Sequence, residues 1–397
     1  MGWSPYSLSQ EEIPKITIET QVFTKLTIRI PNFEGESLLS SKLTSLLRRL
    51  INNHLFILSL ENPPLPGFKA KDYYLKGYLS NQNGKLFLKA DLWDSFENKL
   101  LKTYLLEGSS KKAEILIYTL CNKLIEELSN YKGLAFSKIS FIKRTKRGDE
   151  LYIMDFSKEN LKFLAQAPLI LFPKFSPSGK KLAYLVYENK DYALEILNLY
   201  TGEKKRFNIE GLSSAPIWFP DETKLVLTLS KKEEVNLYLL DIGTSNLTLL
   251  TSERGIKQAG SISKDGKYLA YVWDKGNGPQ IYLLNLHTYE KQRISYEGRY
   301  NTSPRFSPKN DYLIYLSQAG GATRLILYPF KNKNKKEISL KGLIEEPSFS
   351  PTGEYLLVRA KLREGTGFYL IHLDSQISHL YLSGSNIFFP DWGNLPF

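Results

Sequence analysis

The sequence contains very few of the residues that build covalent or metal-centred sites. Among 397 residues there are one cysteine (Cys121), two methionines and four histidines. A single thiol cannot form an intramolecular disulfide or a cysteine-only metal cage. No run approaches 18 consecutive apolar residues, so the sequence predicts no membrane insertion.

Familiar catalytic motifs are also missing. The chain has no Gly-x-Ser-x-Gly nucleophile elbow, no Walker loop and no His-Glu-x-x-His motif. Cys121 lies among leucines at helical spacing, which favours a packed core thiol over a nucleophile. Ordinary surface or strand positions are the better interpretation than metal ligation for His54, His287, His372 and His379. We therefore expect no enzyme activity, no cofactor and no metal.

The formal charge is +12, from 53 Lys and Arg against 41 Asp and Glu. A basic surface can attract nucleic acid, anionic lipid or acidic proteins, but interspersed charges also serve solubility. The densest basic clusters, at residues 143–147 and 331–336, do not alternate with aromatic residues as a single-strand binding surface would. We expect a monomer without a nucleic-acid partner.

A repeat of 43 or 44 residues fills the last two thirds of the chain. Its marker combines a proline, an aromatic residue and a Ser-Pro or similar turn, and the proline position recurs at 173, 216, 260 (glycine), 304, 347 and 390. A second element of the type Leu-Tyr-Leu-Leu-Asp keeps the same period, and turn chemistry explains the Asp or Asn at 155, 198, 241 and 285. Each unit is predicted to form four short strands, the blade of a β-propeller.

The two ends of the repeat region are predicted to share one blade. Residues 138–165 indicate three strands without a proline-led strand before them, and residues 388–392 indicate a proline-led strand with nothing after it. Pairing them would complete a sixth blade and protect exposed strand edges. The expected fold is α+β, with a six-bladed β-propeller over residues 134–397 that is closed by the C-terminal strand.

Residues 1–133 lack the repeat and predict a separate α/β domain. Alternating apolar residues over 15–30 indicate strands, and the leucines between 39 and 51 follow helical spacing. Asn83-Gly84 separates two strand-like runs as a hairpin turn would. Another strand is expected over 100–106, followed by a helix from Ser110 to about Leu128.

This combination resembles the TolB family, the periplasmic components of the Tol-Pal envelope system of Gram-negative bacteria. The resemblance rests on the repeat at residues 175–184, on the ending Phe389-Pro390-Asp391-Trp392 and on the domain order, and it covers nearly the whole chain. It implies a periplasmic, non-enzymatic adaptor that binds the lipoprotein Pal through its propeller and TolA through its N-terminal segment. Such an adaptor supports outer-membrane integrity, cell division and the import of bacteriocins or proteins, with other envelope proteins as possible further partners. An export signal is expected to have been removed, since none is visible here.

Strand geometry gives candidate contact residues for both partners. The loops before the proline-led strands should open on one face around the propeller channel, with Arg299 and Tyr300 as the best anchors for Pal. These loops contain Ser213, Ser214, Arg254, Lys257, Gln258, Arg299, Tyr300, Asn301, Glu345 and Asn386. Within residues 1–20, a strand that could add to the sheet edge of TolA, or instead belong to the first domain, comprises Lys15, Ile16, Thr17, Ile18 and Glu19.

Three alternatives stay open at this point. A propeller-based periplasmic enzyme would be a lyase, which needs a metal-binding histidine cluster facing the channel, or the gating half of a peptidase, which needs a hydrolase domain. The chain could also be another propeller interaction protein. The charge alone would allow a nucleic-acid binder, which steeply salt-dependent DNA binding would reveal.

Overall fold

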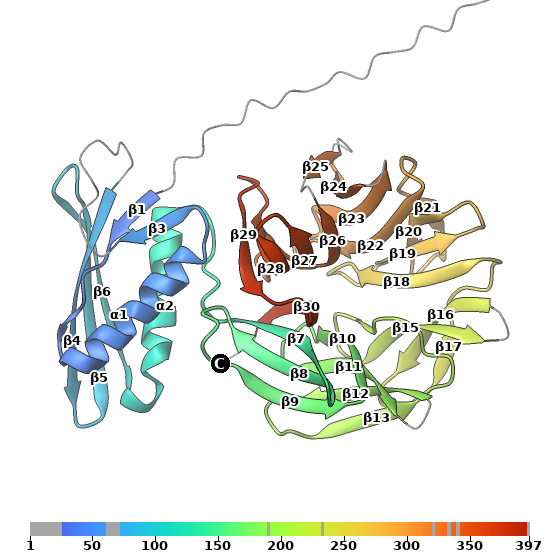
Figure 1. The fold of residues 1–397 in the computed structure, drawn as a ribbon, viewed down its shortest axis with the longest axis horizontal. Helices are drawn as coiled ribbons and strands as arrows, with labels where there is room; N and C mark the ends of the chain where they lie inside the picture. The colour runs from blue at the N-terminus through green and yellow to red at the C-terminus, as the bar shows by residue number, and fades with distance from the viewer. Residues whose placement is uncertain are drawn as a thin grey trace, which may run out of the picture.

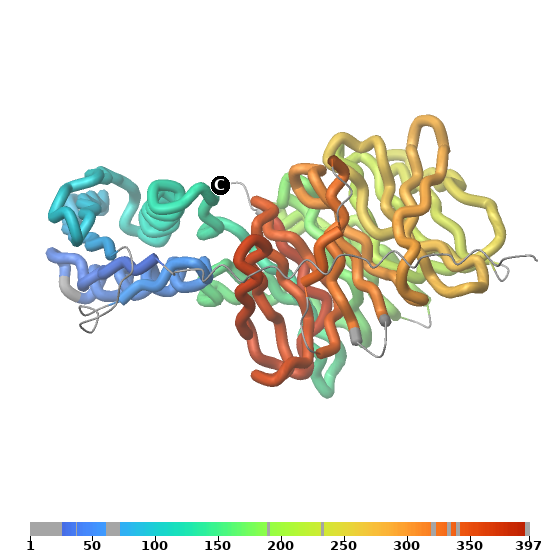
Figure 2. Tube along the Cα trace, turned by 90° about the horizontal axis from the view of Figure 1, so that it is seen from above, coloured from blue at the N-terminus to red at the C-terminus, as the bar shows by residue number. Residues whose placement is uncertain are grey.

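The computed structural model describes residues 26–60, 72–188, 191–231, 234–319, 322–331, 335–338 and 342–394. The segment expected to bind TolA, Lys15 to Glu19, lies outside these residues. Figures 1 and 2 show an α/β unit beside a ring of β-sheets. No helix in the described part of the chain is both long and apolar enough to cross a membrane.

The N-terminal unit is one six-stranded sheet with two helices (Figure 1). The strand order is β3-β1-β4-β5-β6, and β2 pairs with β4. The elements are β1 (Leu26–Arg29), β2 (Glu34–Gly35), α1 (Ser37–Asn52), β3 (Ile57–Leu60), β4 (Asp72–Gln82), β5 (Lys85–Asp94), β6 (Lys99–Ser109), the 3-10 turn η1 (Ser110–Lys112) and α2 (Ala113–Leu128).

The predicted hairpin turn is confirmed between β4 and β5. Asn83 and Gly84 have φ angles of 51° and 83°, the left-handed conformations that a two-residue hairpin loop requires. Asn and Gly adopt these angles at little steric cost, so this dipeptide sets the register in which Gln82 faces Lys85.

Both helices pack against the same face of this sheet. Leu47 of α1 and Leu120 of α2 are fully buried in a cluster with Leu75 and Leu88 of the sheet. Each such leucine contributes about 1.5–3 kcal/mol by leaving water. Cys121 is fully buried in α2, which confirms its prediction as a core thiol.

The repeat region folds as a β-propeller. Four of its sheets have four strands each, in the orders β10-β11-β12-β13, β22-β23-β24-β25, β26-β27-β28-β29 and β30-β7-β8-β9. The strands of the first half are β7 (Ser137–Thr145), β8 (Gly148–Asp155), β9 (Lys162–Ala167), β10 (Leu169–Phe175), β11 (Lys181–Glu188), β12 (Asp191–Asn198), β13 (Lys204–Asn208), β14 (Ile217–Trp218), β15 (Lys224–Lys231), β16 (Glu234–Asp241) and β17 (Leu247–Leu249).

The strands of the second half are β18 (Ile256–Ile262), β19 (Tyr268–Asp274), β20 (Pro279–Asn285), β21 (Lys291–Arg293), β22 (Tyr300–Phe306), β23 (Tyr312–Ala319), β24 (Ala322–Pro329), β25 (Lys336–Ile338), β26 (Leu343–Phe349), β27 (Tyr355–Leu362), β28 (Gly365–His372), β29 (Ser378–Ser383) and β30 (Ile387–Asn394). The prediction of six separate four-stranded sheets holds for four of them. The strands β14 to β21 form a single eight-stranded sheet, because Val235 of β16 pairs with Ile256 of β18 in one parallel step.

The strand that ends the described chain pairs with the strand that starts the propeller. β30 is antiparallel to β7, with Trp392 opposite Ile139. The indole nitrogen of Trp392 also donates a hydrogen bond of 2.9 Å to Ser137 Oγ. This is the pairing that the sequence predicted for the shared blade.

The Asp and Asn residues at the ends of the third strands form turns, as predicted. Asn198 Oδ1 accepts from the backbone N–H of Tyr200 at 3.0 Å, and Asn285 Oδ1 accepts from His287 N at 2.9 Å. Asp241 Oδ1 accepts from Thr244 N at 2.8 Å. Asp155 differs, because its Oδ2 also accepts a hydrogen bond from Tyr118 of α2.

Candidate partner-binding face

The proline-led strands form the innermost ring of the propeller. β10 and β26 both contact β30, and β22 contacts both β18 and β26. In five of these strands a register shift marks a bulge at the proline position. The residue before the proline has a φ of 54° or 55° at Phe172, Ser303, Glu346 and Phe389. A bulge bends a strand and redirects its side chains, and here it turns them toward the centre of the ring.

These side chains line a cavity of about 80 Å³, which we call the axial cavity. Its walls come from five proline-led strands and from the chain before β14 and in β19: Phe172, Lys174, Ala215, Gln258, Ala259, Gly260, Val272, Ser303, Pro304, Arg305, Glu346, Phe389 and Pro390. Two cationic side chains and one carboxylate therefore lie in this wall. Asp391 lines the adjoining cavity together with Lys174 and Arg305.

The charged side chains of the axial cavity are paired with Asp391 or with the backbone. Lys174 Nζ lies 2.6 Å from Asp391 Oδ1, and Asp391 Oδ2 accepts from Phe175 N at 2.8 Å. Arg305 donates to the carbonyl oxygens of Gly260 and, at 3.4 Å, of Pro347. The cavity is thus polar but internally compensated.

Burial changes the pKa of two of these groups in opposite directions. Desolvation lowers the pKa of Lys174, although the neighbouring Asp391 carboxylate acts to raise it. Desolvation raises the pKa of Glu346 to about 7, although the hydrogen bond from Phe389 N acts to lower it. Near neutral pH Glu346 is therefore partly protonated, which reduces the charge density at the centre of the ring.

Exposed apolar residues lie at the start of three successive proline-led strands. The first residues of β18, β22 and β26 are Ile256, Tyr300 and Leu343, with exposed fractions of 60%, 48% and 48%. Each is the fourth residue before the proline position of its repeat, so the three occupy equivalent places. We call Ile256, Tyr300 and Leu343 the apolar rim.

Seven of the ten residues predicted for Pal binding are at least partly accessible around this rim. Glu345 is half-buried and forms an ion pair with Arg359. Asn386 Nδ2 donates to Arg144 O at 2.9 Å, which fixes the start of β30. The exposed members are Ser213, Arg254, Gln258, Arg299, Tyr300 and Asn386.

The side chains of the other three predicted residues are buried rather than accessible to a partner. Lys257 Nζ donates to Asn236 Oδ1 at 2.9 Å, and Asn301 Nδ2 donates to Gln280 Oε1 at 3.0 Å. Ser214 Oγ donates to Thr228 Oγ1 at 2.7 Å. Lys257 and Asn301 lie one residue after the rim residues, and strand alternation turns them into the wall.

Sequence reasoning missed two rim residues and four charged residues of the cavities. Ile256 and Leu343 occupy the same repeat position as Tyr300 but were not among the predicted residues. The charged residues flank the proline position, where other repeats carry Ala, Phe, Ile or Ser: Lys174, Arg305, Glu346 and Asp391. Comparison of the repeats could have identified these four residues, because each places a charge at a position that is small or apolar in other repeats.

One histidine lies elsewhere than expected. His54 is fully buried in the turn after α1, so it is neither a surface nor a strand residue. His372 is buried on β28, a strand position as predicted. His287 is exposed in a turn, as predicted. Within the described ranges, no three His, Cys, Asp or Glu side chains are grouped so that they could hold a metal ion.

A family model described as the TolB β-propeller domain matches residues 125–396. The chain belongs to the TolB family. A protein TolB homolog from Chlorobium chlorochromatii is 27% identical over 289 residues, which are 68% of this chain and 66% of that protein. A protein TolB homolog from Chlorobaculum tepidum is 32% identical over 171 residues, which are 43% of this chain and 39% of that protein.

The crystal structure of TolB from Acinetobacter baumannii shares the fold. Its TM-score with this chain is 0.84 at 20% sequence identity, and the match covers 93% of this chain and 96% of that one. The two alignments to the Chlorobium and Chlorobaculum relatives span less than two thirds of the relatives' own length. The family and the propeller are therefore established for this chain.

Proposed function

We propose that this chain is a non-enzymatic adaptor of the Tol-Pal system in the periplasm, and that it binds Pal at the apolar rim. The supporting observation is the rim itself, where Ile256, Tyr300 and Leu343 are exposed at the starts of three strands whose later residues line the axial cavity. Arg254 and Arg299 are exposed beside them. Aromatic and arginine side chains around an apolar centre are typical of residues that dominate binding energy.

The N-terminal segment is proposed to bind TolA. Lys15 to Glu19 has the alternation of a strand that could extend a partner's sheet. We propose a boundary near residue 133 between the N-terminal domain and the propeller over 134–397. We further propose that the eight-stranded sheet represents two blades, giving six in a ring closed by β30, because the repeat keeps one period throughout.

An adaptor of this kind would connect the two membranes of the envelope. Its proposed cellular roles are outer-membrane integrity, cell division and the import of bacteriocins or proteins, and other envelope proteins could use the same rim. These roles follow from the family and from the two proposed contacts together, so both contacts need to be tested.

The test is calorimetric titration with the soluble domain of Pal from the same organism. We expect saturable binding, and we expect Tyr300→Ala to weaken it by about fivefold or more, because an exposed aromatic at the centre of an interface commonly contributes over 1 kcal/mol. The matched control is Tyr268→Ala. Tyr268 is 40% exposed and lies at the opposite end of the strands, since β19 starts where β18 ends.

A second titration uses the soluble domain of TolA with the full chain and with a chain lacking residues 1–20. Loss of TolA binding in the shortened chain, with Pal binding retained, would support the assignment of the N-terminal segment. Absence of Pal binding to the full chain, or equal effects of the two tyrosine substitutions, would contradict the proposed rim.

A further inference from the structure

One backbone N–H on each proline-led strand points out of the sheet to which that strand belongs. It belongs to the second residue after the proline position. In the first two repeats the following residue makes the ladder bond, since Ser176 N donates to Lys181 O and Phe219 N donates to Lys224 O. Hydrogen-bonded and non-hydrogen-bonded pairs alternate along an antiparallel ladder. The N–H of the residue before each of these donors therefore points away from the neighbouring strand.

Three of these N–H groups donate to a side chain on the preceding proline-led strand of the ring. The three acceptors all come from one repeat position, the residue directly after the proline position. A side chain at that position can thus satisfy the inward N–H of the next strand. The bonds run from Phe306 N to Ser261 Oγ at 2.8 Å, from Trp392 N to Ser348 Oγ at 3.0 Å and from Phe175 N to Asp391 Oδ2 at 2.8 Å.

In the other three repeats the side chain at that position cannot accept a hydrogen bond. It is Lys174, Ile217 or Arg305, and neither an ammonium, an alkyl chain nor a guanidinium has an acceptor. Among the described residues, Trp218 N and Ile262 N accordingly have no hydrogen-bond partner. Buried backbone N–H groups are nearly always paired, so an additional acceptor is expected beside these two.

The residues that carry these two N–H groups line one cavity together with two cationic side chains. This is the cavity that adjoins the axial cavity, and its volume is about 200 Å³. Trp218, Ile262, Lys174, Arg305 and Asp391 all lie in its wall. Lys174 and Asp391 form an ion pair, so the charge that is left over is that of Arg305.

Arg305 has no carboxylate within ion-pair distance in the described part of the chain. Its Nη1 donates to Gly260 O and its Nε to Pro347 O at 3.4 Å, which satisfies hydrogen bonds but does not balance the charge. Burial lowers the pKa of Arg305, although Asp391 and Glu346 act to raise it. Glu346 lies in the axial cavity and is partly protonated near neutral pH, since its pKa is about 7. The adjoining cavity therefore has an excess of positive charge.

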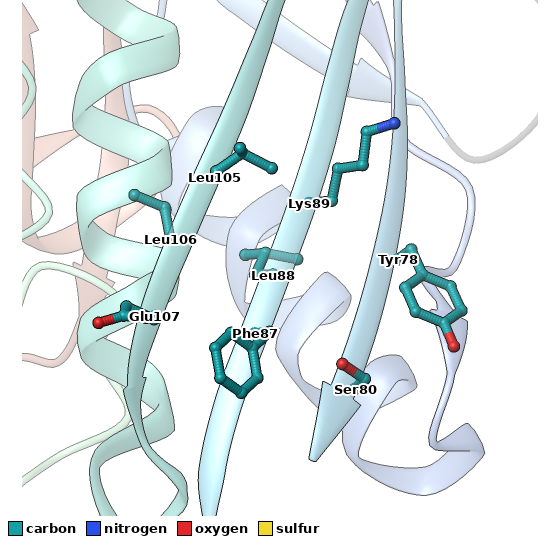
Figure 3. A pocket seen from close by; sticks show the side chains of 8 residues that line it. All are labelled: Tyr78, Ser80, Phe87, Leu88, Lys89, Leu105, Leu106 and Glu107. Carbon is teal, nitrogen blue, oxygen red and sulfur yellow. The ribbon is translucent and has the colours of Figure 1, made fainter. Parts of the chain in front are cut away.

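The groove on the N-terminal sheet has the opposite arrangement. Figure 3 shows Lys89 and Glu107 at this groove, which lies over β4, β5 and β6. Lys89 Nζ lies 3.2 Å from Asp91 Oδ2, and Glu107 Oε2 lies 3.0 Å from Lys85 Nζ. Both charges of the groove are thus balanced by a neighbour, so Lys89 is a suitable control position for the loss of one positive charge.

We propose that the adjoining cavity binds one small monovalent anion, such as chloride. The anion accepts hydrogen bonds from Trp218 N and Ile262 N, and the Arg305 guanidinium supplies the compensating charge. It thereby replaces the side-chain acceptor that three other repeats carry after the proline position. Binding of the anion stabilises the packing of β14 and β18 at the centre of the ring, and it does not depend on Pal or TolA.

The first test is urea unfolding of the full chain in increasing sodium chloride, with the ionic strength held constant by a salt of a bulky sulfonate. An ion that binds only the folded chain stabilises it by mass action, so we expect the urea midpoint to rise with chloride. Ile217→Ser places a hydroxyl where Ser261 and Ser348 act as acceptors, so Ile262 N no longer needs the anion. The apparent affinity for chloride should then fall by about tenfold or more.

Ile217→Val is the matched control, because it changes the same buried side chain without adding an acceptor. It should keep the chloride response of the natural chain. A midpoint of the natural chain that does not change with chloride, or equal responses in the serine and valine variants, would overturn the proposal.

The second test concerns the charge and the place of the ion. Arg305→Gln should weaken chloride binding by about tenfold or more, because a hydrogen bond to a charged group is lost. Lys89→Gln, in the groove of Figure 3, should leave chloride binding unchanged. Crystals of the natural chain grown in bromide locate the ion by anomalous scattering, without reference to stability. We expect a peak within hydrogen-bond distance of Trp218 N and Ile262 N, and a cavity without such a peak would contradict the site.

Discussion

At the scale of single residues, Lys174 and Asp391 form a buried ion pair between the axial cavity and the adjoining cavity. The side chains of Lys174 and Asp391 are only 14% and 13% exposed, and their charged atoms lie 2.6 Å apart. Taking two charges out of water costs several kcal/mol each, which their attraction and their hydrogen bonds offset. Asp391 supplies one of these bonds by accepting from Phe175 N. Removal of either partner would leave an uncompensated buried charge.

We therefore predict that Asp391→Ala lowers the free energy of unfolding by about 3–5 kcal/mol, as measured by urea denaturation. The control is Glu297→Ala, which breaks a pair with Lys335 in which the Glu297 side chain is 85% exposed. That change should cost less than about 1 kcal/mol, because exposed pairs are screened by water. The prediction fails if the two variants unfold at the same urea concentration.

At the scale of elements, β30 pairs with β7 in the sheet that joins the two ends of the propeller. Its Trp392 is buried, stacks with Phe156 at a ring-centroid distance of 5.6 Å and donates to Ser137 Oγ. The Trp392 side chain thus contacts both β7 and the turn after β8. Its contacts are both apolar and polar, and two substitutions can separate them.

Trp392→Ala should lower the free energy of unfolding by about 3–5 kcal/mol, since it leaves a large cavity. Trp392→Phe keeps most of the apolar contact and loses the indole N–H, so we expect a cost of about 1–2 kcal/mol from the hydrogen bond. Thermal and urea unfolding of both variants checks the order. Equal costs would show that the hydrogen bond, rather than the packing, holds β30 in place.

The strands were predictable from the sequence because each repeat contains its own turn residues and its own alternation. The single pairing between Val235 and Ile256 was not, because nothing in a local pattern reports one contact between neighbouring blades. The burial of Lys257 and Asn301 was missed for a related reason: the loop prediction ignored the alternation that continues to the first residue of β18 and β22. The charged cavity residues could be found only by comparing equivalent positions across repeats.

At the scale of the whole molecule, buried hydrogen bonds of Asn53 and His54 connect the N-terminal unit to the propeller. His54 Nε2 accepts from Leu134 N at 3.1 Å, so its Nδ1 carries the proton and donates to Leu50 O at 2.8 Å. Tyr355 of β27 donates to His54 O at 3.1 Å, and Asn53 Nδ2 donates to Phe156 O at 2.7 Å. The hydrogen bond from Leu134 N therefore requires the neutral form of the His54 imidazole.

This requirement predicts a loss of stability in mild acid. Burial lowers the pKa of His54 to about 4, with the Leu50 carbonyl opposing the shift and the charge of His372 adding to it. Between that value and the ordinary pKa of about 6.5, the unfolded chain binds a proton that the folded chain excludes, so stability falls as the pH decreases through this window. From pH 7 to pH 5 we expect His54 to cost about 2 kcal/mol.

The measurement is urea unfolding at both pH values for the natural chain and two variants. His54→Gln should have a smaller pH dependence than the natural chain, even if its stability at pH 7 is lower. His287→Gln, which changes an exposed turn residue, should keep the natural pH dependence. An unchanged slope in His54→Gln would assign the acid sensitivity to other groups.

The pairing of β7 with β30 also constrains the order in which the chain folds. Ser137 and Trp392 are separated by 255 residues, yet they share a hydrogen bond. During synthesis β7 emerges long before its partner strand exists, so one of its edges stays open while the intervening sheets form. Contacts of such high sequence separation are slow to form and leave an edge that other chains can occupy. We infer that the last step of folding in this protein is the docking of β30, and that a chaperone which shields β7 would raise the yield.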